Sequence, residues 1–159
     1  MRDRRALHAD LVALNDRAIV QGATYGVVDV DIDHLLHLNA AQGHAIGDDA
    51  LTRAMDAMEA ALRGDEALYR TGGEEFLGVA AGADLASSTE FAERLRAALH
   101  EARIPHGVDP GGEHLTASFG VAVGPAGSTA TWDETVDRAH RCLIRAKREG
   151  RDRVETTPM

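Results

Sequence analysis

Two groups of carboxylates occur where the surrounding residues predict buried β-strands. Asp29, Asp31 and Asp33 alternate with apolar residues at the end of a valine-rich run. Alternation places the three on one face if the strand stays regular. Carboxylates at a buried strand end are unfavourable unless they are paired or bind metal. From spacing alone, a polar strand end in which Asp33 caps the next helix is an open alternative to a metal site.

The second group consists of Glu74 and Glu75, which directly follow Gly72 and Gly73. A double glycine between short β-rich runs predicts a hairpin that presents both acids at the start of its second strand. If that strand lies beside the one carrying Asp31, then Asp31 and Glu74 meet. Such hard oxygen ligands suit Mg²⁺ or Mn²⁺ bound together with substrate phosphates. The arrangement supports attack of a hydroxyl on an α-phosphate, whereas acids that simply face water are the alternative.

Cations gather near the end of the chain, in the run from Lys147 to Arg151. Lys147 and Arg151 are one helical turn apart, which favours joint capture of a phosphate. Interaction with the dipole at a helix C-terminus is the alternative role for both side chains.

The elements that must position these groups follow from the spacing of apolar residues. Steps of three and four predict helices over 4–21, 34–42 and 84–103, one that Asp48 caps, and one that opens at Thr131 with a capping box. Runs of β-branched and aromatic residues predict strands over 25–32, 67–70, 75–80 and 115–123, and near Val154. This order is typical of an α/β fold, a mixed sheet of about five strands covered by helices.

Length and composition fit one globular domain. The chain has 159 residues, of which 44% are hydrophobic and 27% charged, enough to bury a core. We predict a single domain over 1–159, with an N-terminal helix within 1–22 and a frayed tail over 155–159. No apolar run approaches the roughly 20 residues of a membrane helix, and no signal-peptide core follows the charged start. A cytoplasmic location is therefore expected.

Charge and cysteine content narrow the function further. The net charge is −9, which argues against a general nucleic-acid binder, because the phosphate backbone repels carboxylates. It leaves a nucleotide enzyme open, since acidic sites recruit metal that neutralises phosphate. Cys142 is the single cysteine, so an internal disulfide is impossible. Its position on an apolar helix face predicts a buried thiol.

Several blocks of sequence, in the right order and at the right spacing over nearly the whole chain, resemble the GGDEF family of diguanylate cyclases. GGEEF is a common variant of the motif that names this family. The matching blocks are RRAL at 4–7, DIDHLLHLN at 31–39, GHAIGD at 43–48, GGEEF at 72–76, SFGVA at 118–122 and AKREGRDRV at 146–154. The resemblance implies a palm-like sheet, similar to the palms of polymerases and nucleotidyl cyclases.

The reaction that the resemblance implies is the metal-dependent condensation of two GTP molecules into cyclic di-GMP, with release of pyrophosphate. Because one domain binds one GTP, it also implies a homodimer whose sites meet across a two-fold axis. Mg²⁺ or Mn²⁺ is the implied cofactor. Family members usually carry a sensory or receiver domain, so a controlling domain is expected in addition to this one. Neither nucleic acid nor membrane is an expected partner.

The resemblance also assigns catalytic roles to residues of this chain. Metal would be held by Asp31, the backbone carbonyl of Ile32 and Glu74. Glu75 would assist metal binding or deprotonate the GTP 3′-hydroxyl, which makes Asp31, Glu74 and Glu75 the implied catalytic group. The turn at 72–73 would let ribose and phosphates approach the backbone closely.

Base and phosphate contacts complete the implied site. Asn39 and Asp48 would read the guanine edge. A carboxylate accepts from guanine N1–H and N2–H, which adenine does not offer, so Asp48 favours GTP over ATP. The implied phosphate contacts are the backbone N–H groups around His34 and Leu35 and the side chains of Lys147, Arg151 and Arg70, the last with a surface role as its alternative.

Departures from the family pattern keep other functions open. Leu36 stands where Lys is usual, so one cation near the triphosphate is missing. The remaining departures are Ala40, His140, Ile144 and Asp152, in place of Asp, an acid, Tyr and Asn. A catalytically silent domain that binds GTP or cyclic di-GMP and regulates a partner is therefore the alternative hypothesis. An enzyme with altered nucleotide choice is a third, against which Asp48 argues.

A product-inhibition motif, RxxD, often precedes the signature in this family. Arg63 and Glu66 align with it, but the acid is one methylene longer, and Asp65 is one position away. We therefore expect at most a degenerate inhibitory site, with a solvated helix end as the alternative role for Arg63.

Overall fold

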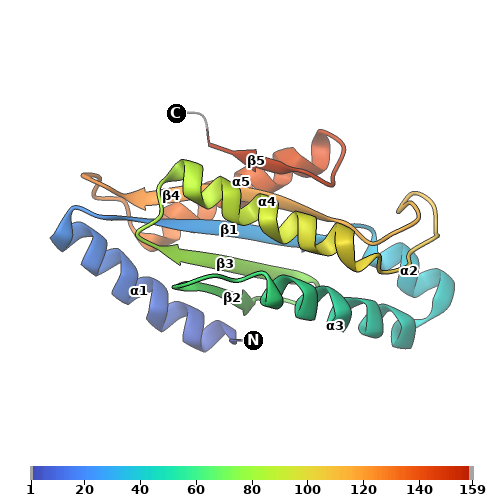
Figure 1. Cartoon of the computed structure of the whole chain (residues 1–159). Coiled ribbons are helices and arrows are strands. Elements are labelled where there is room, and N and C mark those ends of the chain that lie inside the picture. The colour runs from blue at the N-terminus through green and yellow to red at the C-terminus, as the bar shows by residue number, and fades with distance from the viewer. Residues whose placement is uncertain (1, 158–159) are drawn as a thin grey trace.

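The structure is a computed structural model that describes residues 2–157, and its centre is a five-stranded mixed sheet (Figure 1). β1 (Thr24–Ile32) lies in the middle, antiparallel to β3 (Glu75–Ala81) on one side and to β4 (Ala117–Pro125) on the other. β2 (Glu66–Arg70) continues the sheet antiparallel to β3, and β5 (Val154–Thr156) pairs in parallel with β4. The predicted α/β fold with about five strands is confirmed.

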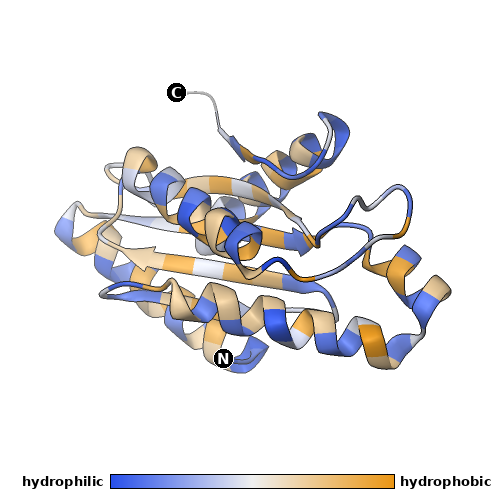
Figure 2. Cartoon of the chain, turned by 45° about the vertical axis from the view of Figure 1, so that its right-hand side comes forward, coloured by the Kyte–Doolittle hydropathy of each residue, from blue (hydrophilic) through white to orange (hydrophobic). Residues whose placement is uncertain are grey.

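Helices cover both faces of this sheet. α1 (Arg4–Gln21) and α5 (Trp132–Arg148) pack on one face. α4 (Leu85–Ala102) packs on the other, with α3 (His44–Ala60) alongside it and α2 (Leu35–Gln42) against α3. Figure 2 shows hydrophobic residues along the strands and alternating hydrophobic and hydrophilic residues along α3. None of the helices formed by residues 2–157 is long and apolar enough to cross a bilayer.

β1 is buried on both faces, as its apolar run predicts. Val28 and Val30 belong to the core between the sheet and the α3–α4 layer, whereas Tyr25 and Val27 belong to the core beneath α1 and α5. Because side chains alternate along a strand, Asp29 and Asp31 share the α1–α5 face. The strand therefore delivers both carboxylates to the side on which α5 ends.

Local signals place most helix boundaries correctly. The capping box of α5 is present, with the Thr131 hydroxyl accepting from the Glu134 N–H at 3.3 Å and the Glu134 carboxylate accepting from the Thr131 N–H at 3.0 Å. The prediction that Asp48 caps α3 is wrong, because α3 begins at His44 and Asp48 lies inside it. Cys142 is buried, as predicted.

The predicted frayed tail over 155–159 is wrong for the residues that the structure describes. Val154 to Thr156 form β5, and the Thr157 N–H donates to the Val121 carbonyl at 3.3 Å. The Arg145 guanidinium also bonds Glu155 and the Thr156 carbonyl. Backbone pairing with β4 orders this segment, and residues 158–159 lie outside the described range.

Candidate functional site

The end of β1 and the turn between β2 and β3 meet at one edge of the sheet. Asp31 pairs in register with Glu75 on β3 and with Ser118 on β4. The Ile32 N–H donates to the Glu74 carbonyl oxygen at 3.1 Å, which ties the turn to the end of the strand. Asp31, Ile32 and Glu74 are therefore brought together, the arrangement that neighbouring strands would produce.

Asp31 carries an orphaned oxygen. Its side chain is buried and its Oδ2 pairs with the Lys147 ammonium, but its Oδ1 has no hydrogen-bond partner among residues 2–157. Burial raises the pKa of the Asp31 carboxyl, and the Lys147 charge opposes this shift. A buried acceptor without a partner is rare in folded proteins, so this oxygen is suited to a ligand.

The Glu74 carboxyl interacts electrostatically with Asp31. Burial raises the pKa of its half-buried carboxyl, and the neighbouring Asp31 charge raises that pKa further. Glu75 is more exposed and adds negative charge that raises the pKa values of Asp31 and Glu74. Like charges held close together favour a bound cation.

The oxygen atoms at the end of β1 are the ligand type that Mg²⁺ and Mn²⁺ prefer. Within the described chain, no three His, Cys, Asp or Glu side chains are grouped to hold a metal by themselves. Two carboxylates and a backbone carbonyl remain at the Asp31 edge, and Mg²⁺ is ordinarily bound by one or two carboxylates plus substrate phosphates. The residues present therefore fit a metal that arrives with a phosphate ligand.

A second orphaned oxygen marks the junction of α2 and α3. Asn39 Oδ1 is buried and has no hydrogen-bond partner within residues 2–157. An ideal Cβ on Gly47 would lie 1.5 Å from this oxygen, so only glycine in α3 leaves room for the Asn39 side chain. Asp48 follows directly and is exposed. The junction thus offers an amide oxygen and a carboxylate, both acceptors for N–H donors.

Residues predicted to bind phosphate gather where β1 leads into α2. His34 has a left-handed backbone (φ 55°) and precedes the first turn of α2, which Leu35 begins. Burial lowers the pKa of the His34 imidazole, and the positive charge of nearby Arg151 lowers it further. N–H groups at a helix N-terminus together with a cation form an anion-binding arrangement. Leu36 is 73% exposed at the same turn, so an apolar side chain stands where the family has a cation.

Two predicted phosphate ligands have protein partners. The Lys147 ammonium is paired with the Asp31 carboxylate, and its contact with phosphate stays a prediction. Arg70 donates from Nε to the Gly72 carbonyl at 3.1 Å and from Nη2 to the Gly73 carbonyl at 2.7 Å. These bonds make Arg70 a residue of the turn, and its contact with phosphate stays a prediction.

One glycine of the turn faces open space beside the acids, whereas a Cβ on the other, Gly72, would lie 3.0 Å from Glu75 Oε2. The predicted hairpin forms, but neither Gly72 nor Gly73 adopts a left-handed backbone. A Cβ on Gly73 would meet nothing within 4 Å. The open space allows a ligand to approach the backbone, which supports the role implied by the family.

Arg63 and Glu66, which align with the product-inhibition motif of the family, lie apart from the sheet edge that carries Asp31. The Glu66 carboxylate accepts from the Arg63 N–H at 2.8 Å and pairs with the Arg94 guanidinium from α4. Arg63 is exposed after the end of α3. Its contact with Glu66 is therefore through the backbone, and a role in product binding stays a prediction.

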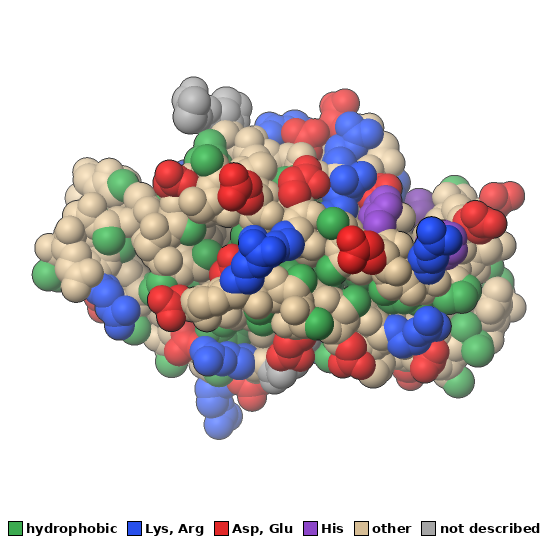
Figure 3. Space-filling view, viewed as in Figure 1, with side chains coloured by type: hydrophobic (Ala, Val, Ile, Leu, Met, Phe, Trp, Pro, Cys, Tyr) green, Lys and Arg blue, Asp and Glu red, His purple; other side chains and the backbone are tan. Residues whose placement is uncertain are grey.

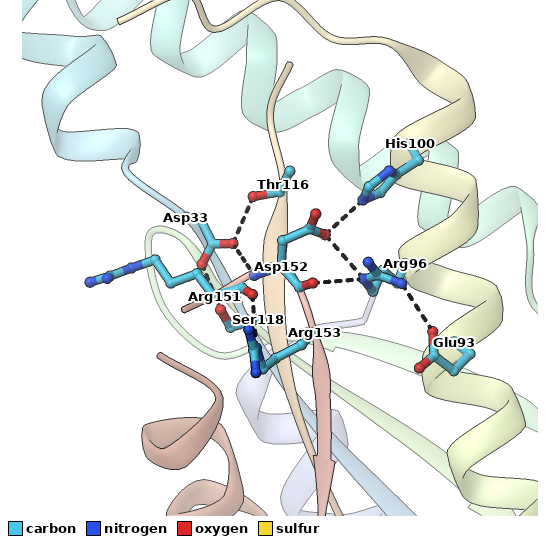
Figure 4. A network of polar contacts seen from close by, with 9 residues as sticks. All are labelled: Asp33, Glu93, Arg96, His100, Thr116, Ser118, Arg151, Asp152 and Arg153. Atoms are coloured by element: carbon cyan, nitrogen blue, oxygen red, sulfur yellow. Dashed lines mark hydrogen bonds and ion pairs between the residues drawn. The ribbon is translucent and has the colours of Figure 1, made fainter. Parts of the chain in front are cut away.

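The structure adds contacts that sequence reasoning missed. Buried Asp29 accepts from the His140 ring at 2.9 Å (Nδ1 to Oδ2), across 111 residues of sequence. Asp33 does not cap α2: its oxygens accept from the Thr116 and Ser118 hydroxyls, each at 2.7 Å, and from the Asp152 N–H at 3.1 Å (Figure 4). Nothing local signals these pairs, because their partners come from α5 and from the segments around β4.

A mixed five-stranded sheet with acids at the end of its central strand is the arrangement of palm-like nucleotidyl cyclase domains. The family model described as "Diguanylate cyclase, GGDEF domain" matches residues 1–153. The chain therefore belongs to the GGDEF family.

Curated relatives agree with this assignment. The chain is 32% identical over 155 residues to diguanylate cyclase VdcA of Vibrio cholerae, covering 96% of this chain and 43% of VdcA. It is 30% identical over 155 residues to response regulator PleD of Caulobacter vibrioides, covering 97% of this chain and 34% of PleD. The chain thus spans less than half the length of either relative.

Solved structures share the fold. Diguanylate cyclase SiaD of Pseudomonas aeruginosa, in complex with its activator SiaC, superposes with a TM-score of 0.88 at 32% identity, covering 98% of this chain and 58% of SiaD. The active GGEEF domain of a Vibrio cholerae diguanylate cyclase gives a TM-score of 0.86 at 26% identity, covering 99% and 98% of the two chains.

Proposed function

We propose that this chain is a diguanylate cyclase domain that condenses two GTP molecules into cyclic di-GMP with release of pyrophosphate. The orphaned, buried Oδ1 of Asp31 beside Glu74 is the observation that carries the proposal, because it supplies a metal ligand at the position that the family motif implies. We place the reaction in the cytoplasm, where GTP is available.

In the proposed mechanism, the chain's own residues orient the two reactants. Asn39 and Asp48 accept from the guanine edge and select GTP over ATP. The backbone around His34 and Leu35, with Arg151, holds the triphosphate for in-line attack. A bound Mg²⁺ supplies charge stabilisation at the α-phosphate, and Asp31, the Ile32 carbonyl and Glu74 would hold it. Glu75 lies beside this site, where it can take the 3′-hydroxyl proton or assist metal binding.

A homodimer follows from the stoichiometry of the proposed product. One chain presents one Asn39–Asp48 pair, whereas cyclic di-GMP contains two guanines, so two domains face each other with their sites joined. PleD is named a response regulator and SiaD was solved with an activator. We infer that a further domain or partner likewise controls how these domains meet.

The experiment is chromatography with mass detection on the purified chain with GTP and Mg²⁺. Cyclic di-GMP is expected, with a rate per chain that rises with protein concentration. EDTA and the Glu74→Ala variant serve as matched negative controls. Absence of product at high concentration would contradict catalysis.

The second candidate is a silent domain that binds GTP or cyclic di-GMP and regulates a partner. The exposed Leu36 favours it, because a cation is missing beside the proposed triphosphate position. Isothermal titration with both nucleotides separates the two functions: binding without turnover selects the silent domain. Leu36→Lys is the informative variant, because restored turnover would identify the missing cation as the cause.

A further inference from the structure

A cluster of charged side chains joins α4 to the loop after α5, and Asp152 is at its centre (Figure 4). Asp152 Oδ1 accepts from Arg96 Nε at 3.0 Å and lies 2.7 Å from His100 Nε2. Arg96 Nε also donates to the Asp152 carbonyl oxygen at 3.0 Å, and the Asp152 N–H donates to Asp33 at 3.1 Å. Both the side chain and the backbone of Asp152 are therefore held.

The segment around Asp152 has an unusual backbone conformation. Arg151 (φ 63°) and Asp152 (φ 45°) are consecutive left-handed residues, and neither is glycine. Asp tolerates this conformation better than most residues, whereas Arg has no such preference. Backbone of this kind persists where surrounding contacts over-determine it. The contacts of Asp152 hold this backbone on one side. The hydrogen bond from the Arg151 N–H to the Ala146 carbonyl, 2.9 Å, holds it on the other.

The consequence concerns the Arg151 side chain. Within the described chain its guanidinium has no hydrogen bond or ion pair, and Figure 4 shows it extending away from the cluster. Arg151 and His34 line one cavity of about 370 Å³ together with His100 and Asp152. Figure 3 shows histidine side chains beside the C-terminal end of α4 on this part of the surface. Arg151 therefore lies on the same cavity as His34, in the turn that precedes α2.

We propose that Asp152, anchored by Arg96 and His100, is a positioning residue that fixes Arg151 toward the nucleotide phosphates. A single half-exposed ion pair contributes little, but Asp152 joins the Arg96 and His100 side chains of α4 to a backbone that is also bonded to Asp33. The carboxylate acts through backbone geometry and does not itself touch the nucleotide. The inference deepens the proposed function and rests on it for the identity of the nucleotide.

Steady-state kinetics on the full chain tests the role. Asp152→Ala is expected to raise KM for GTP about tenfold while kcat stays within about twofold of wild type. Asp152→Asn is expected to show a smaller rise, because Asn tolerates the left-handed backbone and its amide oxygen still accepts from Arg96. Arg141→Ala, which removes an exposed ion pair elsewhere on α5, should leave KM unchanged. An unchanged KM in Asp152→Ala would overturn the inference, as would a lower kcat and melting temperature without a change in KM.

A double-mutant cycle shows whether Asp152 acts through Arg151. In an Arg151→Ala background, Asp152→Ala should add no further increase in KM, because the group that it positions is gone. An equal increase in both backgrounds would mean that Asp152 acts independently of Arg151, and the positioning role would be wrong.

Hydrogen exchange without nucleotide keeps the test separate from the proposed function. Amides over 150–153 should exchange faster in Asp152→Ala and Arg96→Met than in wild type and Arg141→Ala. If wild type neither binds nor turns over GTP, the proposed function fails. Unchanged exchange in these variants would then overturn the positioning role as well, whereas faster exchange would support the cluster's hold on Arg151.

Discussion

Asp31 combines burial, a cationic partner on one oxygen and no partner on the other. A carboxylate in this state is unfavourable in the free protein and gains most from a bound cation. The same physical features that oppose folding at this position therefore favour metal binding.

Asp31→Asn is expected to lower turnover about a hundredfold or more, the scale of losing one electrostatic stabiliser of a transition state. Mn²⁺ binding in the presence of GTP, followed by electron paramagnetic resonance, should weaken in parallel. Asp56→Asn, on the exposed side of α3, is the matched control and should change neither quantity. Unchanged turnover in Asp31→Asn would remove Asp31 from the metal site.

The raised pKa values of Asp31 and Glu74 predict a pH dependence of stability. Near pH 4, about the ordinary carboxyl pKa, a larger fraction of both groups is protonated in the folded protein than in the unfolded chain. As the pH rises, the unfolded chain releases its protons first, so the free energy of unfolding falls until the folded groups also ionise. Chemical denaturation of metal-free protein should show this fall between the ordinary and the raised pKa values.

Asp31→Asn isolates the contribution of one group to that pH dependence. The variant should lose less stability than wild type over the same pH range, because the carboxyl with the raised pKa is absent. Added Mg²⁺ should reduce the loss in wild type more than in the variant. Identical pH profiles for the two proteins would contradict the assignment.

At the scale of elements, the junction of α2 and α3 depends on one glycine. Gly47 lies inside α3, where glycine is about 1 kcal/mol less favourable than alanine, yet a Cβ there would collide with Asn39 Oδ1. The helix therefore gives up intrinsic stability in order to accommodate the side chain proposed to read guanine.

Gly47→Ala is expected to weaken GTP binding about tenfold by displacing Asn39, while the helix itself is retained. Isothermal titration and circular dichroism measure the two effects separately. In an Asn39→Ala background the clash is absent, so Gly47→Ala should raise stability by about 1 kcal/mol and leave GTP binding unchanged. Equal loss of GTP affinity in both backgrounds would show that Gly47 acts without Asn39.

At the scale of the whole molecule, the proposed homodimer would join two such sites into one active centre. Turnover per chain is therefore expected to rise with protein concentration and to reach a plateau once nearly all chains are in the homodimer. Sedimentation velocity in the presence of a non-hydrolysable GTP analogue should show the dimer over the same range. A rate per chain that is independent of concentration in a monomeric protein would contradict the two-fold arrangement.

The sequence alone determined the elements whose signals are local. The apolar run of β1 predicts a strand buried on both faces, and Thr131 with Glu134 predicts the start of α5. The double glycine before Glu74 predicts the hairpin. Periodicity and capping act over a few residues, so they can be read directly. The same locality explains one error: Asp48 has the chemistry of a cap, but α3 begins one turn earlier.

Only the tertiary structure decided which polar groups meet. The Asp29 carboxylate and the His140 ring, the Asp33 carboxylate and the Asp152 N–H, and the Glu66 carboxylate and the Arg94 guanidinium are each separated by many residues. Their pairing depends on the register of the sheet and on where α4 and α5 cross it. The sequence predicts a strand near Val154, but only the fold decided that this strand, β5, pairs in parallel with β4. Local propensity cannot encode such contacts, since the energy that forms them comes from partners placed by the rest of the fold.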